Sequence, residues 1–341
     1  MAKISPGKLW GMRRLADHGG RWKMIAIDQR GPLMQPIAQK RGVEQAAWSD
    51  LALVKSSVTE HLSPHASAML LDPDYAYFSS VGKMSPSIGL CLSLEHHITT
   101  DLGQGRLSRT IPDWSVEKIR RIGGDAVKLL IWYRPDADAK VCEHQQALVK
   151  KIGQECKDHD IVLLLELLVY PLASDTPGFL EANRTKLVIE SMRDFASPEF
   201  LVDIYKLEPP AAILNVPKPD SSQATAWQKH FDDLSQHITR PWVLLSAGAG
   251  PEDFMQSLTY AYRAGASGYL CGRAIWHAAF ERFPNIAAFE QDLKTESCRY
   301  VQELNALTDR LATPWSEKWG TSATIEMTGQ GPEFSKHYVV S

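Results

Sequence analysis

Eight short apolar runs recur along the chain, and segments with helical periodicity separate them. The runs are continuously apolar instead of alternating with polar residues, which is typical of parallel strands that are covered on both faces. This feature constrains the fold more than any other. In chain order the predicted strands are MIAI (24–27), AMLLD (68–72), GLCLSLE (89–95), AVKLLIWY (126–133), IVLLLELLVY (161–170), IYKLE (204–208), WVLLSAG (242–248) and GYLCG (268–272).

Helices are predicted between these runs, because apolar residues recur there at a spacing of three to four. Asp113 before the second helix and Pro251 with two acidic residues before the last are start signals. The glycines at 123–124 and in AGA (264–266) are stop signals. The predicted helices span residues 44–62, 115–122, 138–158, 180–195, 223–237 and 251–264.

Eight strands that alternate with helices predict an α/β protein, a (β/α)8 TIM barrel. An open, doubly wound sheet is the alternative, but no GxGxxG follows the first strand and the strand count reaches eight. We therefore expect one domain over residues 1–315, with residues 274–314 as a closing helix or helix pair. Residues 316–341 are interpreted as a C-terminal tail.

Composition excludes several other classes of protein. Of 341 residues, 44% are hydrophobic and 23% charged, and the formal net charge is −3, so no basic surplus indicates a nucleic acid or a membrane surface as partner. Five widely spaced cysteines without a CxxC motif argue against a disulfide framework. The N-terminus lacks an apolar signal region, and the run 161–170 is too short to span a bilayer. We expect a cytoplasmic protein.

Ionisable residues stand late in several predicted strands, which is the end where TIM barrels carry their active sites. Lys128, Glu166 and Lys206 lie within apolar runs on three successive strands. Any one of them has a plain structural interpretation, as a satisfied buried group or as an outward lysine. Together, facing the barrel lumen, they would form a compensating charge cluster, since buried charges persist when they are paired. Other strand ends carry Asp28, Gln29, Arg30, Asp72 and Glu95.

A lysine in an apolar strand also suggests a reaction. A buried amine near another ammonium is more readily neutral, and a neutral amine attacks carbonyl groups to give a Schiff base. The protonated imine stabilises a neighbouring carbanion, which suits aldol cleavage. In this interpretation Lys206 is the nucleophile, and Glu166 moves protons at the substrate hydroxyl.

The last two predicted strands lead into candidate phosphate-binding segments. SAGAG (246–250) is followed by a helix start at Pro251, so backbone N–H groups would point outward there. Gly272 and Arg273 follow the eighth strand. TIM barrels often bind phosphate in these two loops, although the glycines alone would also fit ordinary turns. The expected substrate is a phosphorylated ketose or a similar carbonyl compound.

The chain resembles the tagatose 1,6-bisphosphate aldolase family of class I aldolases, which also includes bacterial sulfofructosephosphate aldolases. The resemblance spans nearly the whole chain, and its fragments occur in the family order. They are IAIDQRG (25–31), LLDPDY (70–75), GGDAVKLLIWY (123–133), LLLELLVY (163–170), DIYKLEPP (203–210), LLSAGAGPEDF (244–254), LCGRAIW (270–276) and ELNALTDRLATPW (303–315).

The resemblance implies a role for each matching residue. Lys206 matches the Schiff-base lysine, Glu166 the proton-transfer residue and Lys128 an active-site lysine. It further implies cleavage of tagatose or fructose 1,6-bisphosphate to dihydroxyacetone phosphate and glyceraldehyde 3-phosphate. No metal or other cofactor is expected, and the protein is expected to be a homodimer or homotetramer. The implied substrate-binding residues are Asp28, Gln29, Ser246, Gly248, Gly272 and Arg273.

Two segments depart from the family pattern. His96 and His97 follow Glu95, and residues 73–87 are unfamiliar in detail; both lie at the predicted mouth of the site. They leave open whether the distal group is a phosphate or a sulfonate, as in sulfofructose 1-phosphate, and which aldehyde is released. A zinc-dependent aldolase using the two histidines is disfavoured, because the other strands end without a histidine partner. Two further alternatives are a sugar-phosphate-binding regulator without turnover and an imine enzyme for another carbonyl reaction.

Overall fold

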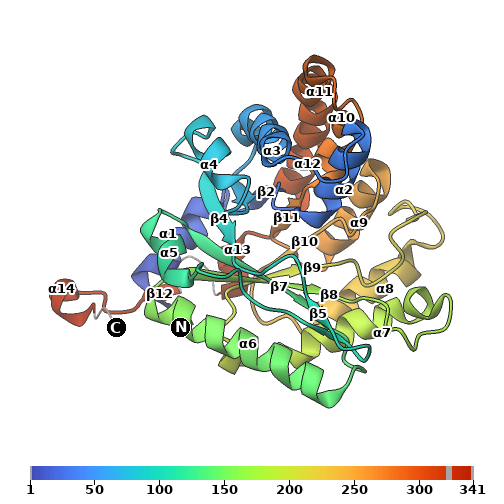
Figure 1. The fold of residues 1–341 in the computed structure, drawn as a ribbon. Helices are drawn as coiled ribbons and strands as arrows, with labels where there is room; N and C mark the ends of the chain where they lie inside the picture. Colours follow the sequence, from blue (N-terminus) through green and yellow to red (C-terminus); the bar gives the residue numbers. More distant parts are fainter. Residues whose placement is uncertain (1, 320–324, 339–341) are drawn as a thin grey trace.

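The computed structural model describes residues 2–319 and 325–338, and its centre is a closed barrel of eight parallel strands (Figure 1). The strands follow one another around the barrel in chain order, and the last pairs with the first. They are β2 (Trp22–Ala26), β3 (Ala68–Leu71), β4 (Gly89–Ser93), β7 (Ala126–Trp132), β8 (Val162–Leu168), β9 (Ile204–Leu207), β10 (Trp242–Leu244) and β11 (Gly268–Cys271). The predicted TIM barrel is confirmed.

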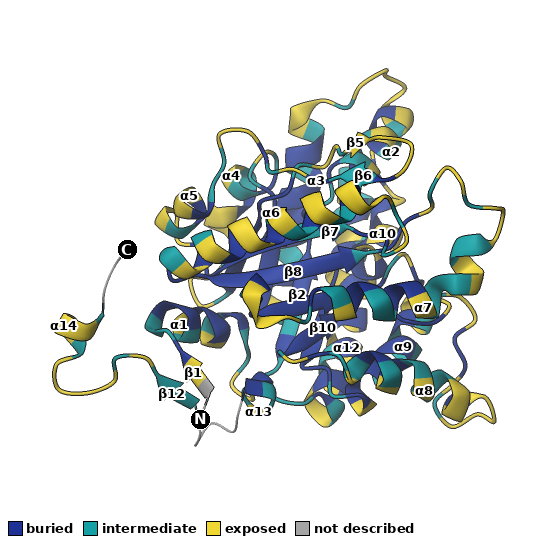
Figure 2. Cartoon of the chain, turned by 90° about the horizontal axis from the view of Figure 1, so that it is seen from below, coloured by how far each residue is buried: buried dark blue, intermediate teal, exposed yellow. Residues whose placement is uncertain are grey.

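Both faces of each barrel strand are buried, as Figure 2 shows for β8. Ala126, Leu164 and Ile204 belong to the apolar cluster inside the barrel. Their neighbours Val127 and Leu165 belong to the larger cluster between the strands and the helices. Each strand therefore needs apolar residues at consecutive positions, which explains the continuous runs in the sequence.

Six outer helices match the predicted ones within a few residues. Pro251 opens the last of them with Glu252 and Asp253 in its first turn. Gly123 and Gly265 take positive φ angles of 93° and 87° just after two helices, as expected for stop signals. The six are α3 (Trp48–Leu62), α5 (Val116–Arg121), α6 (Ala139–Asp158), α7 (Phe179–Asp194), α8 (Ala224–Ser235) and α9 (Pro251–Arg263).

The predicted start signal at Asp113 is wrong. Helix α5 is capped by Ser115, whose hydroxyl accepts a hydrogen bond of 3.2 Å from the backbone N–H of Lys118. Asp113 instead takes a φ of 57° in the turn that precedes the helix. A serine and an aspartate two residues apart are both good caps, and only the turn geometry decides between them.

Helix α1 (Pro6–Leu15) was not predicted, and it covers the N-terminal end of the barrel. It packs through glycines: a Cβ on Gly7 would lie 2.3 Å from the carbonyl oxygen of Asp160, and one on Gly11 would lie 2.6 Å from that of Asp125. Those two aspartates precede β8 and β7. Helix α2 (Gly31–Arg41), also not predicted, follows β2.

The C-terminal part of the chain returns to the N-terminal end of the barrel. Residues 274–314 divide into α10 (Arg273–Phe280), α11 (Ile286–Asp292), a π-helical turn (Leu293–Ser297) and α12 (Cys298–Leu311). Beyond them, Trp315 and Trp319 of α13 (Trp315–Trp319) join the apolar cluster inside the barrel. The short strand β12 (Ile325–Met327) pairs in parallel with β1 (Ala2–Ile4). A tail boundary at residue 315 stays a prediction.

None of the helices in residues 2–319 and 325–338 is long and apolar enough to cross a membrane.

Candidate active site

The three ionisable residues predicted on successive strands meet inside the barrel. Glu166 on β8 places its Oε2 atom 2.9 Å from Nζ of Lys206 on β9 and 2.9 Å from Nζ of Lys128 on β7. All three residues are buried, with exposed fractions of 5% or less. The register explains the meeting, because Glu166 and Lys206 are paired positions on neighbouring strands. Inward residues alternate along a strand, and Lys128 and Lys206 each stand two residues after an inward one, Ala126 and Ile204.

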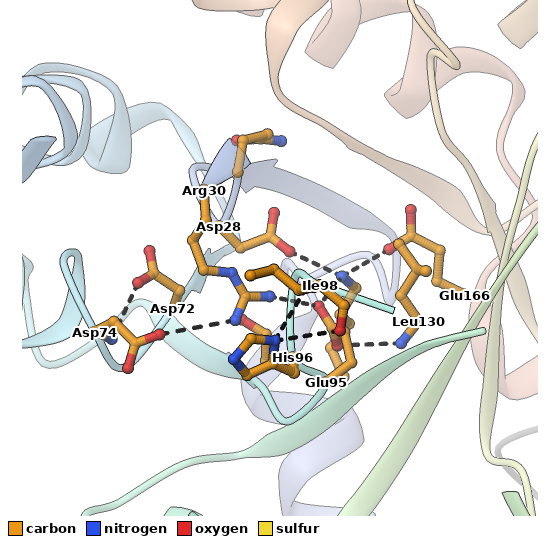
Figure 3. Close-up of polar contacts among 12 residues, drawn as sticks. Asp28, Arg30, Asp72, Asp74, Glu95, His96, Ile98, Leu130 and Glu166 are labelled. Carbon is orange, nitrogen blue, oxygen red and sulfur yellow. Dashed lines mark hydrogen bonds and ion pairs between the residues drawn. The ribbon is translucent and has the colours of Figure 1, made fainter. Parts of the chain in front are cut away.

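Lys128 is surrounded by carboxylates. Besides Glu166, its ammonium contacts Asp28 Oδ2 at 2.8 Å and Glu95 Oε1 at 2.8 Å, and Figure 3 shows these three acids converging. Burial by itself would lower the pKa of Lys128, but Asp28, Glu166 and Glu95 outweigh it and raise this pKa well above the ordinary value. Lys128 is therefore a fixed positive charge beside Glu166.

Asp28 and Glu95 both contact Lys128, and each has further charged or polar neighbours. Burial would raise the pKa of the Asp28 carboxyl, but the ammonium groups of Lys128 and Lys206 outweigh it, so that pKa is lowered. Glu95 accepts hydrogen bonds from Arg30 Nη2 at 3.0 Å and from the backbone N–H of Leu130 at 3.1 Å (Figure 3). Glu95 was recognised in the sequence as a strand end but not as part of the site.

Lys55 anchors the segment that presents Asp28 and Gln29. It lies on α3, is fully buried, and donates hydrogen bonds of 2.7 Å to the backbone carbonyls of Ile27 and Gln29. It also pairs with Asp72, which follows β3. Burial lowers the pKa of Lys55 despite the attraction of Asp72. No pattern in the sequence distinguishes this lysine, because it stands in an otherwise ordinary amphipathic helix.

A cavity of about 200 Å3 opens beside Lys206 at the C-terminal end of the barrel. Its lining brings together Lys206 and Glu166 with Gln29 from the first barrel strand. Of the predicted substrate-binding residues, Gln29, Ser246, Gly272 and Arg273 line it. The lining does not include Asp28, Lys128 or Gly248. Lys128 contacts Glu166 and Asp28 contacts Lys128, so these two residues are linked to the cavity through Glu166.

The two predicted phosphate-binding loops form one wall of this cavity. Helix α9 begins after the loop 245–250, where Ala247 and Gly248 take positive φ angles of 51° and 95°. Helix α10 begins at Arg273, directly after Gly272. A Cβ on Gly272 would lie 2.3 Å from the carbonyl oxygen of Ala26, so only glycine fits there. The wall thus combines an exposed guanidinium with the starts of two helices.

Two further polar residues line the cavity and were not predicted. Arg184 of α7 forms an ion pair with Glu208, and Glu208 also accepts a hydrogen bond of 2.6 Å from the backbone N–H of Val169. Burial raises the pKa of Glu208 although Arg184 opposes the shift. Glu208 stands two residues after Lys206, and this spacing predicts that both side chains lie on the same side of the strand. Arg184 stands on a helix, and no sequence pattern points to its place in the cavity.

His96 and His97 stack on each other with ring centroids 4.8 Å apart, close to the Arg30 and Glu95 pair. The Nδ1 atom of His96 accepts a hydrogen bond of 3.0 Å from the backbone N–H of Ile98. Burial, followed by the positive charge of Arg30, lowers the pKa of His97 to about 4, so this ring is neutral at neutral pH. Among the residues described, no group of three or more His, Cys, Asp or Glu side chains is arranged to hold a metal ion.

The fold and the site together define a TIM-barrel protein with a buried lysine–carboxylate pair at the catalytic end of the barrel. Residues 23–278 match the sequence family described as DeoC/LacD family aldolase. The chain is 34% identical over 337 residues to a tagatose 1,6-diphosphate aldolase of Listeria monocytogenes serotype 4b, covering 96% of this chain and 99% of the relative. A Streptococcus agalactiae serotype V relative with the same name is 33% identical, covering 90% and 97%. The chain belongs to the DeoC/LacD aldolase family, whose members are carbon–carbon lyases, and the resemblance noted in the sequence is confirmed.

Solved structures support the fold independently. An archaeal fructose 1,6-bisphosphate aldolase superposes with a TM-score of 0.59 at 16% identity, covering 88% of this chain and 98% of that one. A fructose-bisphosphate aldolase of Plasmodium falciparum gives 0.64 at 11% identity, covering 91% and 97%. At such low identity these matches establish the barrel fold alone.

Proposed function

We propose that this enzyme is a class I aldolase that cleaves a ketose 1,6-bisphosphate, tagatose or fructose 1,6-bisphosphate, through a Schiff base on Lys206. The observation that carries the proposal is the position of Lys206, buried in a cavity, 2.9 Å from a carboxylate oxygen of Glu166 and facing a wall with an exposed arginine and two helix starts. The tagatose 1,6-diphosphate aldolases among its relatives support the choice of substrate.

The arrangement supports the following reaction. The substrate binds with its C1 phosphate at Ser246, Gly248, Gly272 and Arg273. Lys206 in its neutral form attacks the C2 carbonyl to give a carbinolamine, and loss of water leaves a protonated imine. Glu166 then takes the proton of the C4 hydroxyl while the C3–C4 bond breaks, and the bond electrons move into the enamine. Glyceraldehyde 3-phosphate leaves, C3 is reprotonated, and water releases dihydroxyacetone phosphate and the free amine.

The other buried charges have supporting roles in this proposal. Lys128, a fixed cation beside Glu166, holds that carboxylate in place next to Lys206. Asp28 fixes Lys128 from the other side. Gln29 lines the cavity, and its side-chain Oε1 atom has no hydrogen-bond partner among the described residues, so it is available to a substrate hydroxyl.

We place this reaction in the cytoplasm, where the five cysteines, all free in the structure, stay as thiols. We also expect a dimer or a tetramer, which the mass of the native protein in solution tests directly. The distal group of the substrate is assigned as phosphate. A sulfonate in its place, as in sulfofructose 1-phosphate, is the specific alternative, because His96, His97 and residues 73–87 depart from the family pattern at the mouth of the site.

A cleavage assay tests the proposal. Purified protein is supplied with tagatose 1,6-bisphosphate, fructose 1,6-bisphosphate or sulfofructose 1-phosphate, and the release of dihydroxyacetone phosphate is followed with a coupling dehydrogenase. We expect turnover of the bisphosphates by the wild type and by the exposed-lysine variant Lys229→Ala, and loss of turnover in Lys206→Ala. Binding of the bisphosphates without turnover by the wild type would instead identify a sugar-phosphate-binding protein.

A further inference from the structure

A second cavity lies at the N-terminal end of the barrel, away from the Lys206 pocket. Its volume is about 350 Å3, against about 200 Å3 for the cavity beside Lys206. It opens between α1, the end of α6, α13 and the segments that lead into β9 and β10. Nothing in the proposed reaction uses this cavity, because the strands β8 to β10 carry the reacting side chains at their other ends.

The charge of this second cavity is strongly positive. Four basic residues line it, Lys3, Lys8, Lys157 and Arg240, against one carboxylate, Asp203. Lys8 and Asp203 neutralise each other, since Nζ lies 2.7 Å from Oδ2 and both side chains are mostly buried. Lys3, Lys157 and Arg240 form no ion pair within 4.0 Å with a carboxylate of the residues that the structure describes.

Arg240 is held in place by an aromatic residue. Its guanidinium carbon lies 4.3 Å from the ring centroid of Trp319, which is itself only 5% exposed and lines the same cavity. Stacking fixes the plane of the guanidinium and leaves its N–H donors free to bind an anion at the ring edge. Such a preformed arginine is a better anion ligand than a mobile surface lysine, because less side-chain entropy is lost on binding.

The remaining wall of the cavity is mostly apolar, although Ser5, Ser197 and Thr239 also line it. Ile4, Pro198, Leu201 and Val202 contribute to it together with the Trp319 ring. The hydroxyl of Tyr205 is already engaged, because it donates a hydrogen bond of 2.7 Å to the carbonyl of Phe195. A ligand that fits this wall therefore has a compact apolar body, and a ligand that fits the three unpaired cations carries a doubly charged head.

We propose that this cavity binds a small organic phosphate, with the phosphate between Arg240, Lys157 and Lys3 and its apolar part against Trp319. The site is distinct from the phosphate-binding loops after β10 and β11. It touches the same strand as the reacting lysine, because Asp203 directly precedes β9 and also accepts a hydrogen bond of 2.8 Å from the backbone N–H of Leu163. Tyr205, the neighbour of Lys206, lines the cavity as well.

Phenyl phosphate is a suitable probe, and calorimetric titration measures its binding. All proteins carry Arg273→Gln, so that the cavity beside Lys206 contributes little. We expect one phenyl phosphate per chain, weakened at least tenfold by adding Lys3→Gln, Lys157→Gln and Arg240→Gln together. A matched control carries Lys151→Gln, Lys229→Gln and Lys336→Gln, which remove the same charge from exposed positions and should leave the dissociation constant unchanged.

Several outcomes decide the proposal. Phenol, which has the same ring without the charge, should not bind, and inorganic phosphate should bind more weakly than phenyl phosphate. If Arg240→Gln disturbs folding by removing the stack on Trp319, the double variant of the two exposed lysines still has to weaken binding. Absence of binding at millimolar concentration, or equal weakening in the matched control, would overturn the proposal. Neither result depends on whether Lys206 forms a Schiff base.

Discussion

Replacing Lys128 by methionine tests the buried charge cluster most sharply. Methionine keeps most of the length and the apolar stem, and it removes the ammonium that three carboxylates share. Loss of one partner from a buried ion pair costs about 3–5 kcal/mol, because the remaining charges stay buried without compensation. For a chain of 341 residues, unfolding entropy of roughly 2.1 cal/mol/K per residue converts this into a fall in Tm of ~4–7 °C.

The effect should depend on pH in a defined direction. The folded-state pKa of Asp28 is lowered, so its ionised form contributes stability above the unfolded pKa, and this contribution is lost as pH falls through the folded value. Without Lys128 the pKa of Asp28 rises. The buried carboxylate then destabilises the folded protein at neutral pH, and protonation removes this destabilisation. The difference in Tm between wild type and variant is therefore largest near neutrality and shrinks as pH approaches the ordinary Asp value of about 4.

Differential scanning fluorimetry between pH 4 and pH 8 measures both effects. Lys229→Met is the control, since the side chain of that lysine is 71% exposed and, within residues 2–319 and 325–338, pairs only with Asp233 one helical turn away. It should leave Tm unchanged at every pH. A Lys128→Met protein with the wild-type Tm at pH 7.5, or a difference that grows towards acid pH, would refute the account of the cluster.

Three further predictions concern the site itself. Glu166→Gln should lower kcat by about 10²–10⁴-fold, as expected for loss of general acid–base transfer, with a small change in KM; a kcat within a few-fold of wild type would contradict its role. Arg273→Gln should raise KM for the bisphosphate by roughly 10–100-fold, because a charge-assisted hydrogen bond to phosphate is lost. The rise in KM should be much smaller for a substrate without the C1 phosphate, and an equal rise for both substrates would argue against this phosphate site. Lys55→Met should lower both Tm and activity, because it leaves Asp72 buried without its partner and frees the carbonyls of Ile27 and Gln29; a fall in Tm with unchanged KM would show that Lys55 does not position Gln29.

The barrel was predictable because its strands must be apolar on both faces, and this requirement produces continuous apolar runs that can be recognised in the sequence. The same reasoning identified Lys128, Glu166 and Lys206, since a charge within such a run has no low-energy place except beside another charge. The contact between Glu166 and Lys206 then follows from strand order and register.

The parts of the site that the sequence did not reveal come from outside the strands. Lys55 and Arg184 stand on helices, where a basic residue is ordinary, and only the packed structure shows that they reach Asp72 and Glu208. Helix α1 was missed for a related reason. It is held by the close approach of Gly7 and Gly11 to backbone carbonyls, and two glycines in a segment argue against a helix when judged by propensity alone.

The proposed reaction depends on a Schiff base between Lys206 and the ketose phosphate. The most direct test incubates the protein with dihydroxyacetone phosphate after treatment with EDTA, reduces it with borohydride, and locates the adduct by peptide mass spectrometry. We expect one stable adduct per chain on the peptide that contains Lys206, and none in Lys206→Met. An adduct on another lysine, or EDTA-sensitive cleavage without any adduct, would contradict it.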